Sequence, residues 1–300
     1  MAQDVQPRCV VGRLKSVKMR NETEQRMSSV PARKKSLGQH FLNSGRTVIR
    51  MIDALCPEPD MTVVEIGPGR GALTRELASV SNDLVLVEMD SDLIPLLRQN
   101  FPTARIVEGD AGALDTGALA PHDRRVVCAG NLPYNAGGRI LFNFLTGPLF
   151  PVRMVFMFQK EVAIRLCASP GDREFGAVSL LVNLMARTKY LFDVPPSRFI
   201  PPPAVMSGVV LFDMLPRLPD TDFLRGAPFA TFAHAIFAQP RKTIVNSMMK
   251  GLSMERTGVL ALLEAGGVDP AVRPCLVNGT QAVAMFDAWS MGNQSSSTGV

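Results

Sequence analysis

The sequence has no hydrophobic run that approaches the roughly 20 apolar residues needed to cross a bilayer. Segments such as residues 176–186 are shorter and are interrupted by polar side chains. No apolar core follows the basic residues near the N-terminus, and Asp4, Glu22 and Glu24 are atypical of an organelle transit peptide. These absences exclude a membrane-spanning role and disfavour an exported protein. They predict a cytoplasmic location.

The chain also lacks the ligand spacings of common metal sites. Its five cysteines are widely separated, without a Cys-x-x-Cys pair, and there is no His-Glu-x-x-His run. We therefore expect no structural zinc and no metal at the functional site. An odd number of scattered cysteines also indicates reduced thiols, as in a cytosolic protein.

Basic residues are concentrated at the N-terminus. Residues 1–50 contain 11 Lys or Arg and 3 Asp or Glu, for a net charge of +8, whereas the rest of the chain has a net charge of −3. Such a segment, which includes Arg33, Lys34 and Lys35, can release counterions from the phosphates of a nucleic acid. A solvated, disordered extension is the alternative on charge alone.

Short apolar runs alternate with helical patterns along most of the chain. An apolar content of 46% is ample for a packed core. The expected strands are residues 62–66, 84–88, 105–107, 125–130, 153–158, 189–194 and 208–212, and the expected helices are residues 72–79, 93–100, 138–145 and 160–168. This alternation predicts a doubly wound α/β sheet of seven strands whose last strand is antiparallel.

A different pattern begins after residue 214. Pro216 and Pro219 are followed by three stretches with helical periodicity, at residues 229–250, 256–265 and 280–289. We predict four parts: a basic, disordered N-terminal extension (1–32), an α/β domain (33–214), a small all-helical domain (215–292) and a disordered Ser/Gly-rich tail (293–300).

A glycine-rich turn follows the first predicted strand. Residues 63–71 read Val-Val-Glu-Ile-Gly-Pro-Gly-Arg-Gly, and such glycines let the backbone approach an adenosine-type ligand closely. Glu88 ends the second strand, where a carboxylate can accept both ribose hydroxyl hydrogens. Asp110 ends the third strand and can accept a hydrogen from an adenine amine. Three ligand-facing groups thus fall at three successive strand ends.

The fourth predicted strand ends in Asn131-Leu132-Pro133-Tyr134. Asn131 and the carbonyl of Leu132 can accept the two hydrogens of an exocyclic amine, Pro133 fixes the turn, and Tyr134 can stack on a flat base. We call this arrangement the amine clamp. The plainer interpretation is a buried strand and a proline turn with a half-buried tyrosine.

The glycine turn also fits a competing hypothesis. Gly67, Gly69 and Ala72, followed by Glu88, match the dinucleotide pattern Gly-x-Gly-x-x-Ala with an acid about 20 residues later. A nicotinamide-dependent dehydrogenase would carry the same pattern. Hydride transfer has no use for an amine clamp at the fourth strand, so the clamp favours methyl transfer to a base over hydride transfer.

With these motifs in order, the chain resembles the S-adenosyl-L-methionine-dependent rRNA adenine N6-dimethyltransferases, and most of all those that act on the small ribosomal subunit. The resemblance covers roughly residues 33–290 and includes Leu-Gly-Gln-His-Phe-Leu at 37–42, Gln-Lys-Glu-Val at 159–162, the proline-rich segment 194–203 and Phe-Ala-Gln-Pro-Arg-Lys-Thr at 237–243. It implies a Rossmann-like, seven-stranded class I methyltransferase sheet and a helical RNA-binding domain. The implied substrate is a pair of adjacent adenosines near the 3′ end of 16S rRNA in the immature small subunit.

The resemblance also implies site residues. The family's cofactor contacts fall on His40, Leu42, Gly67, Glu88, Asp110 and Asn131. Asn131, Leu132 and Tyr134 would hold the target adenine, and Phe199 would stack on its other face. RNA contacts would come from Arg33, Lys34, Lys35, Arg241 and Lys242, and we expect a monomer. Taken alone, Phe199 is typical of a core aromatic and His40 of a surface or capping histidine.

Two departures from the family pattern stand out. Ala136-Gly137-Gly138 replaces the usual aliphatic residue, Ser and Thr, which removes an N-cap hydroxyl and is expected to loosen the loop beside the target base. Pro240 replaces a usual arginine, which removes a phosphate contact and is expected to bend the helix.

Two further hypotheses stay open at this point. A large-subunit rRNA methyltransferase that confers macrolide resistance shares the fold and the clamp, but Asn-Leu-Pro-Tyr and the Gln-x-Arg-Lys segment argue against it. A non-catalytic RNA-binding assembly factor is the other, and the intact Glu88, Asp110, Asn131 and Tyr134 argue against that.

Overall fold

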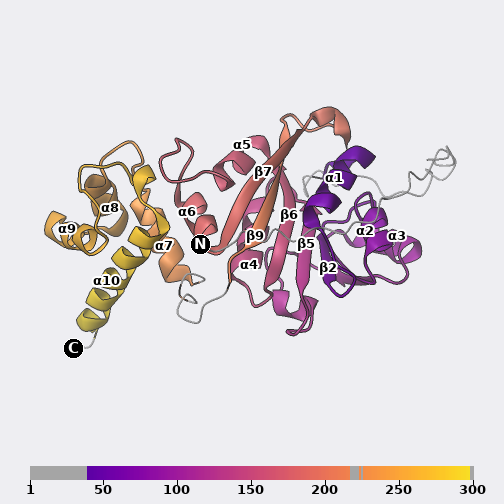
Figure 1. Cartoon of the computed structure of the whole chain (residues 1–300), viewed down its shortest axis with the longest axis horizontal. Helices are drawn as coiled ribbons and strands as arrows, with labels where there is room; N and C mark the ends of the chain where they lie inside the picture. Colours follow the sequence, from indigo (N-terminus) through magenta and orange to yellow (C-terminus); the bar gives the residue numbers. More distant parts are fainter. Residues whose placement is uncertain (1–38, 217–222, 224–225, 298–300) are drawn as a thin grey trace, which may run out of the picture.

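The structure is a computed structural model that describes residues 39–216, 223 and 226–297. The basic extension with Arg33, Lys34 and Lys35 lies outside these residues. A twisted sheet flanked by helices occupies one end of the molecule, and a group of helices occupies the other (Figure 1).

Seven strands form the large sheet in the order β4-β3-β2-β5-β6-β9-β7. They are β2 (Thr62–Ile66), β3 (Asp83–Glu88), β4 (Arg105–Glu108), β5 (Val126–Asn131), β6 (Pro151–Gln159), β7 (Ala186–Val194) and β9 (Ser207–Met214). The five strands β4, β3, β2, β5 and β6 run parallel to one another, whereas β9 runs antiparallel to β6 and β7. All seven predicted strands and the antiparallel last strand are confirmed. A second sheet pairs β1 (Phe41–Leu42) with β8 (Phe199–Ile200), which the sequence did not predict.

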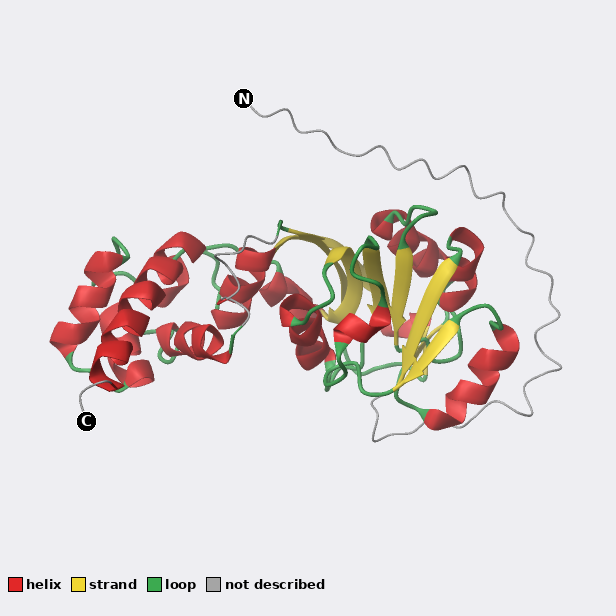
Figure 2. Cartoon of the chain, turned by 90° about the horizontal axis from the view of Figure 1, so that it is seen from below, coloured by secondary structure: helices red, strands yellow, loops and turns green. Residues whose placement is uncertain are grey.

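Helices cover both faces of the sheet (Figure 2). On one face lie α1 (Gly45–Leu55), α2 (Thr74–Val80) and α3 (Ile94–Asn100), and on the other lie α4 (Gly137–Thr146), α5 (Lys160–Leu166) and α6 (Ala177–Met185). Successive residues of β2 point to opposite faces of the sheet, as the two-residue period of a strand requires. Val63 packs in the hydrophobic layer on the side of α1, α2 and α3, and Val64 packs in the layer on the side of α4, α5 and α6. Short 3₁₀ helices span Ser91–Leu93, Thr116–Leu119, Pro196–Arg198 and Pro274–Leu276.

The helical part consists of α7 (Ala227–Ile236), α8 (Ile244–Leu252), α9 (Arg256–Ala265) and α10 (Gly279–Ser297). The prediction of a single helix over residues 229–250 is wrong, because the chain turns between α7 and α8 around Pro240, which has no backbone N–H to donate. The predicted end of α10 at Trp289 and the expected disorder from residue 293 are also corrected, since α10 continues to Ser297. Residues 298–300 lie outside the described part.

One hydrophobic cluster joins the two parts. It runs from Phe156 in the sheet through Leu180 of α6 to Phe229, Phe232 and Phe286 of the helical part. Strand β9 ends at Met214 and α7 begins at Ala227. The division of the chain into separate domains at residue 215 stays a prediction.

The cysteines only partly match expectation. Cys128, Cys167 and Cys275 are free, whereas Cys56 forms a disulfide, so the prediction of reduced thiols throughout is wrong for that residue. Within the described residues no helix is long and apolar enough to cross a membrane, and no three His, Cys, Asp or Glu side chains are placed to hold a metal ion.

The start of α4 offers a stability test. Its N-cap residue, Ala136, forms no side-chain capping bond, and two glycines follow. A Cβ atom at Gly138 would have no atom within 4 Å, whereas one at Gly137 would lie 3.2 Å from Phe158 Cδ1. Gly138→Ala should raise the free energy of unfolding by up to about 1 kcal/mol, because alanine loses less backbone entropy in a helix. Urea unfolding should show a smaller gain, or a loss, for the matched Gly137→Ala; equal gains would contradict this account.

Candidate active site

The main candidate site lies at the carboxyl ends of β2 and β5. From β2 the chain builds the sheet outward through β3 and β4, and it then returns to the other side of β2 as β5, so the sheet order reverses between them. Ligands of open α/β sheets bind at such a switch point. A cavity of about 220 Å³ opens there. Its walls include seven of the predicted site residues: His40, Leu42, Gly67, Glu88, Asn131, Leu132 and Tyr134.

The glycine turn after β2 brings bare backbone to this cavity. Gly67, Gly69 and Gly71 have φ values of +65°, +56° and +80°, which glycine adopts far more readily than other residues. A Cβ atom on Gly71 would lie 2.6 Å from Phe101 Cε2. The turn therefore depends on glycine both for its backbone conformation and for its packing.

The Glu88 side chain ties this turn to the end of β3. Its Oε2 accepts from Gly69 N at 3.0 Å and its Oε1 accepts from Asp90 N at 2.9 Å. Glu88 is 6% exposed and lines the cavity. Burial raises the pKa of its carboxyl above the ordinary value, although the two backbone donors oppose that rise. Each oxygen still has a lone pair for a ligand hydroxyl.

Asn131 ends β5 with its amide oriented by a backbone contact. Its Nδ2 donates to His40 O at 2.8 Å, which turns Oδ1 toward other partners. The backbone of the next residue is held by β6, because Leu132 N donates to Met157 O at 3.3 Å. Within the described part of the chain, no group donates to Asn131 Oδ1 or to Leu132 O. The two predicted acceptors of the clamp are therefore adjacent and available.

Tyr134 presents its ring beside these acceptors and stacks on His40. The two ring centroids are 5.6 Å apart with an interplanar angle of 27°. Tyr134 Oη is 2.6 Å from Ser207 Oγ, and His40 Nδ1 donates to Pro201 O at 2.8 Å. Burial raises the pKa of Tyr134, so its hydroxyl stays protonated at neutral pH. A base that stacks on this face of Tyr134 would have to displace His40.

The structure does not place Phe199 or Asp110 in the cavity wall. Phe199 is 2% exposed and pairs with Leu42 across the small β1–β8 sheet, so it is a core side chain here. Asp110 forms an ion pair with Arg139, and Arg139 lines the cavity in its place. Base stacking by Phe199 and adenine recognition by Asp110 both stay predictions.

Glu65 is a further residue of the cavity wall, and the sequence motifs do not single it out. It is 2% exposed, it lines the cavity, and its Oε2 accepts no hydrogen bond from any described residue. Burial raises the pKa of Glu65 to about 8; the nearby Thr74 hydroxyl opposes this rise, and the Glu88 carboxylate adds to it. A signal was present, since this acid interrupts an apolar strand just before the glycine turn. An acid at such a position can receive a ligand ammonium group.

The raised pKa of Glu65 predicts proton release on ligand binding. At pH 7 this carboxyl is mostly protonated, because its pKa is about 8. A bound ammonium group favours the carboxylate, so a ligand that carries such a group should release up to one proton as it binds. Calorimetry in buffers of different ionisation enthalpy measures that release. We expect Glu65→Gln to abolish it, and an unchanged proton count in this variant would contradict the assignment.

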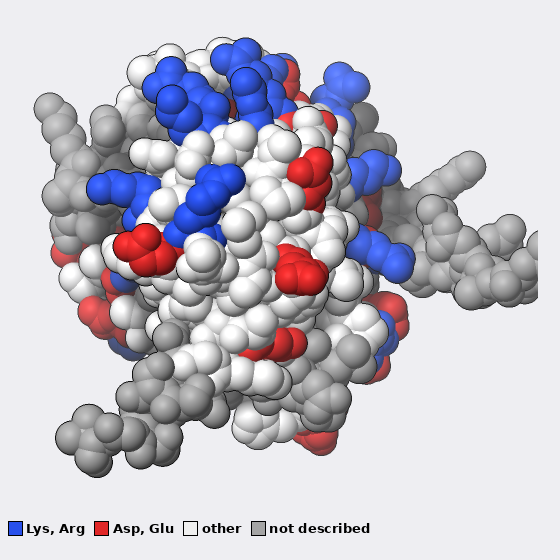
Figure 3. All heavy atoms as spheres, turned by 90° about the vertical axis from the view of Figure 1, so that its left-hand side faces the viewer, with Lys and Arg blue, Asp and Glu red and all other residues white. Residues whose placement is uncertain are grey.

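The predicted RNA contacts in the helical part lie away from the cavity. Arg241 and Lys242 are exposed on the turn between α7 and α8. Basic side chains gather at the top of this end of the molecule, with others at its sides and near its middle, and acidic ones are scattered among them (Figure 3). The position of these two residues on an exposed turn is compatible with phosphate contact, which stays a prediction.

The glycine turn after β2 and the buried acid at the end of β3 are shared with dinucleotide-binding dehydrogenases. The seven-stranded sheet with its antiparallel β9, together with the acceptor pair after β5 at the switch-point cavity, indicates a class I methyltransferase. Residues 31–272 match the family model of ribosomal RNA adenine dimethylase. The chain belongs to this family. The match runs from the basic segment before β1 to the region after α9, and thus includes both parts of the molecule.

Named relatives are similar over most of the chain. The ribosomal RNA small subunit methyltransferase A of Alcanivorax borkumensis is 40% identical, and the match covers 84% of this chain and 88% of that protein. The protein of the same name from Caulobacter vibrioides is 39% identical over 80% of this chain and 91% of its own length.

Solved structures share the fold. A dimethyladenosine transferase from Plasmodium falciparum superimposes with a TM-score of 0.71 at 21% identity, covering 85% of this chain and 98% of that one. A 23S rRNA methyltransferase, ErmE, gives a TM-score of 0.60 at 23% identity, covering 83% and 99%. At these identities the likeness shows the fold alone.

Proposed function

We propose that the protein transfers methyl groups from S-adenosyl-L-methionine to the N6 amines of two adjacent adenosines near the 3′ end of small-subunit rRNA. The names of the relatives, which specify the small subunit, support this choice over large-subunit rRNA. The single observation that carries it is the pair of free acceptors at Asn131 and Leu132, held at the edge of the switch-point cavity. We place this activity in the cytoplasm, during assembly of the small subunit.

The residues of the cavity fit S-adenosyl-L-methionine. The positive-φ glycines leave room for a ligand against the backbone, and the buried Glu88 carboxylate offers lone pairs to two ribose hydroxyls. Glu65 offers an unpaired carboxylate oxygen to an amino group. When bound, the cofactor supplies a methyl group on a positively charged sulfur, which makes that carbon electrophilic.

The clamp would prepare the amine for attack. Adenine N6 is a poor nucleophile because its lone pair is delocalised into the ring. If Asn131 Oδ1 and Leu132 O accept its two hydrogens, the lone pair is directed out of the ring plane and toward the methyl carbon. Positioning of this kind supplies much of the rate in two-reactant reactions. The alkylated amine is acidic and can lose its proton to water, so the site needs no strong base.

The aromatic side chains would hold the base and its charge. Tyr134 offers a ring face to the flat adenine, and that face also favours nearby positive charge. Its hydroxyl is held by Ser207, which fixes the ring direction. The target adenine has to leave its stack in the RNA to reach this cavity. The small residue Ala136, which lines this cavity, would leave room for a monomethylated amine to enter again.

The test uses purified protein with labelled S-adenosyl-L-methionine and three substrates: immature small subunits, mature large subunits and naked rRNA. We expect N6,N6-dimethyladenosine in the small subunits, identified by mass spectrometry of the nucleosides. Label in the large-subunit RNA would instead support the resistance enzyme. Cofactor binding without label in any RNA would support the non-catalytic assembly factor.

A further inference from the structure

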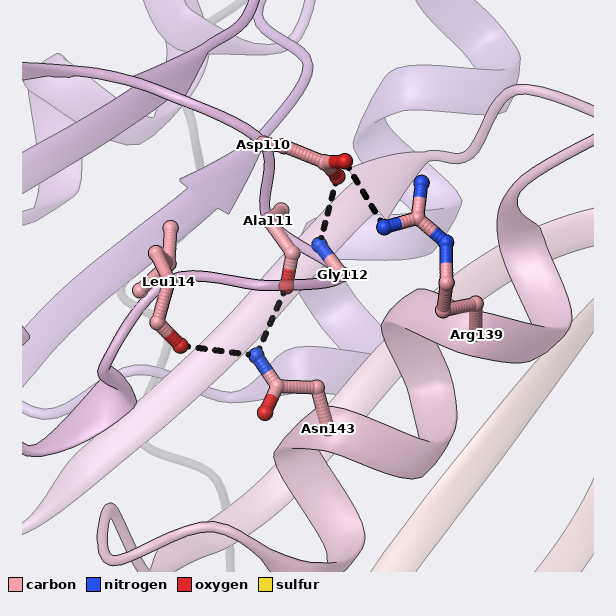
Figure 4. A network of polar contacts seen from close by, with 6 residues as sticks. All are labelled: Asp110, Ala111, Gly112, Leu114, Arg139 and Asn143. Atoms are coloured by element: carbon pink, nitrogen blue, oxygen red, sulfur yellow. Dashed lines mark hydrogen bonds and ion pairs between the residues drawn. The ribbon is translucent and has the colours of Figure 1, made fainter.

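Arg139, in the first turn of α4, closes the cavity on the side of Asp110. Its Nη1 donates to Asp110 Oδ2 at 2.7 Å (Figure 4). The other carboxylate oxygen, Oδ1, accepts from Gly112 N at 2.9 Å. The hydrogen bond from Arg139 also holds the pKa of Asp110 below its ordinary value. The orientation of the Asp110 carboxylate and its negative charge are therefore both fixed.

The loop opposite α4 is shaped to receive the guanidinium group. A Cβ atom at Gly112 would lie 2.8 Å from both Cζ and Nη1 of Arg139. Any side chain at this position would push against the planar head of Arg139 and weaken its bond to Asp110. The glycine at position 112 is thus part of the same arrangement.

A second side chain of α4 holds the same loop. Asn143 follows Arg139 by four residues, so both lie on one face of the helix. Asn143 Nδ2 donates to Ala111 O and to Leu114 O, each at 3.0 Å (Figure 4). Residues 110–114 are therefore anchored to α4 at their beginning, by Arg139, and at their end, by Asn143.

We propose that Arg139 is a positioning residue that sets the preference of the cavity for an adenine-bearing cofactor. This inference rests on the proposed function, because it takes S-adenosyl-L-methionine as the ligand. Arg139 lines the cavity, and it holds the Asp110 carboxylate, which lies beside the cavity wall, as a charged acceptor for the exocyclic amine of that adenine. Each oxygen retains a lone pair after its bond within the protein. Hypoxanthine carries a carbonyl in place of the amine, and the carboxylate would repel it.

The test compares the binding of two non-reactive ligands, S-adenosylhomocysteine and S-inosylhomocysteine, by calorimetry. Wild-type protein should bind the adenosyl ligand at least about tenfold more tightly, which corresponds to the free energy of one charge-assisted hydrogen bond. Arg139→Gln should weaken adenosyl binding by about tenfold and leave inosyl binding nearly unchanged. Arg139→Lys should recover part of the loss because it keeps a positive charge. Arg98→Gln, an exposed change at the end of α3, is the matched control.

A double-variant cycle with Asp110→Asn tests whether Arg139 acts through Asp110. If it does, the double variant binds the adenosyl ligand about as weakly as Asp110→Asn alone. Unchanged adenosyl binding in Arg139→Gln would overturn the inference, and so would an equal loss for both ligands, which would indicate general damage to the cavity. A wild-type protein that binds neither ligand would refute the proposed function and this inference with it.

Discussion

Replacing Asn131 with alanine should reduce methylation of small-subunit rRNA by about 100- to 1,000-fold, the usual cost of losing one well-placed polar group from a transition state. The variant lacks Oδ1, so one hydrogen of the target amine has no acceptor and the nitrogen lone pair is no longer directed at the methyl carbon. It also lacks Nδ2, so His40 O loses its partner at 2.8 Å.

The measurement should separate the chemical step from binding. Single-turnover methylation with saturating cofactor and RNA should show the loss in the rate constant, with a smaller change in the concentration needed for saturation. Asn100→Ala, an exposed change at the end of α3, is the control and should retain the wild-type rate. An Asn131→Ala protein with a near wild-type single-turnover rate would refute the amine clamp.

The sheet was predictable because its strands carry their own signals. Strand β2 is buried throughout, and its five residues agree with the predicted boundaries, because a central parallel strand is apolar on both faces. The glycine turn and Glu88 were predictable for a related reason, since strand ends and positive-φ positions restrict the residue type. Helix α1, which was not predicted, also carries a local signal: Val48, Met51, Ile52 and Leu55 have helical spacing, and Ser44 caps the helix.

The unpredicted features depend on contacts between distant parts of the chain. Phe199 is in the core because β8 pairs with β1, which lies more than 150 residues earlier, and a two-residue strand has no periodicity to detect. The pairing of Asp110 with Arg139 likewise joins a loop to a helix that the sequence pattern treats separately. The break between α7 and α8 was the exception, because Pro240 was a visible local signal against one continuous helix.

Replacing Glu88 with glutamine should weaken the binding of S-adenosylhomocysteine by about 10- to 100-fold. The carboxylate accepts from Gly69 N and Asp90 N and still has two lone pairs for the ribose hydroxyls. A glutamine has one acceptor oxygen, so its NH2 group faces one of these backbone donors. That donor is then buried without a partner, which should lower the free energy of unfolding by about 1–3 kcal/mol. Glu108→Gln, on the exposed residue that pairs with Glu88 across β3 and β4, is the matched control.

The pH dependence of this binding separates the charge of Glu88 from its shape. Burial raises the pKa of Glu88 above its ordinary value of 4.5, so the carboxylate gains a proton at a higher pH than a free side chain would. The protonated group has fewer acceptor sites for the ribose, so affinity should fall as the pH is lowered through that raised pKa.

The folded state also binds this proton more tightly than the unfolded state, so the contribution of Glu88 to stability should decrease as the pH rises through the same interval. Glu88→Gln should remove both dependences, whereas Glu108→Gln should keep them. A wild-type affinity that does not fall as the pH is lowered through that interval would argue against ribose binding by an ionised Glu88.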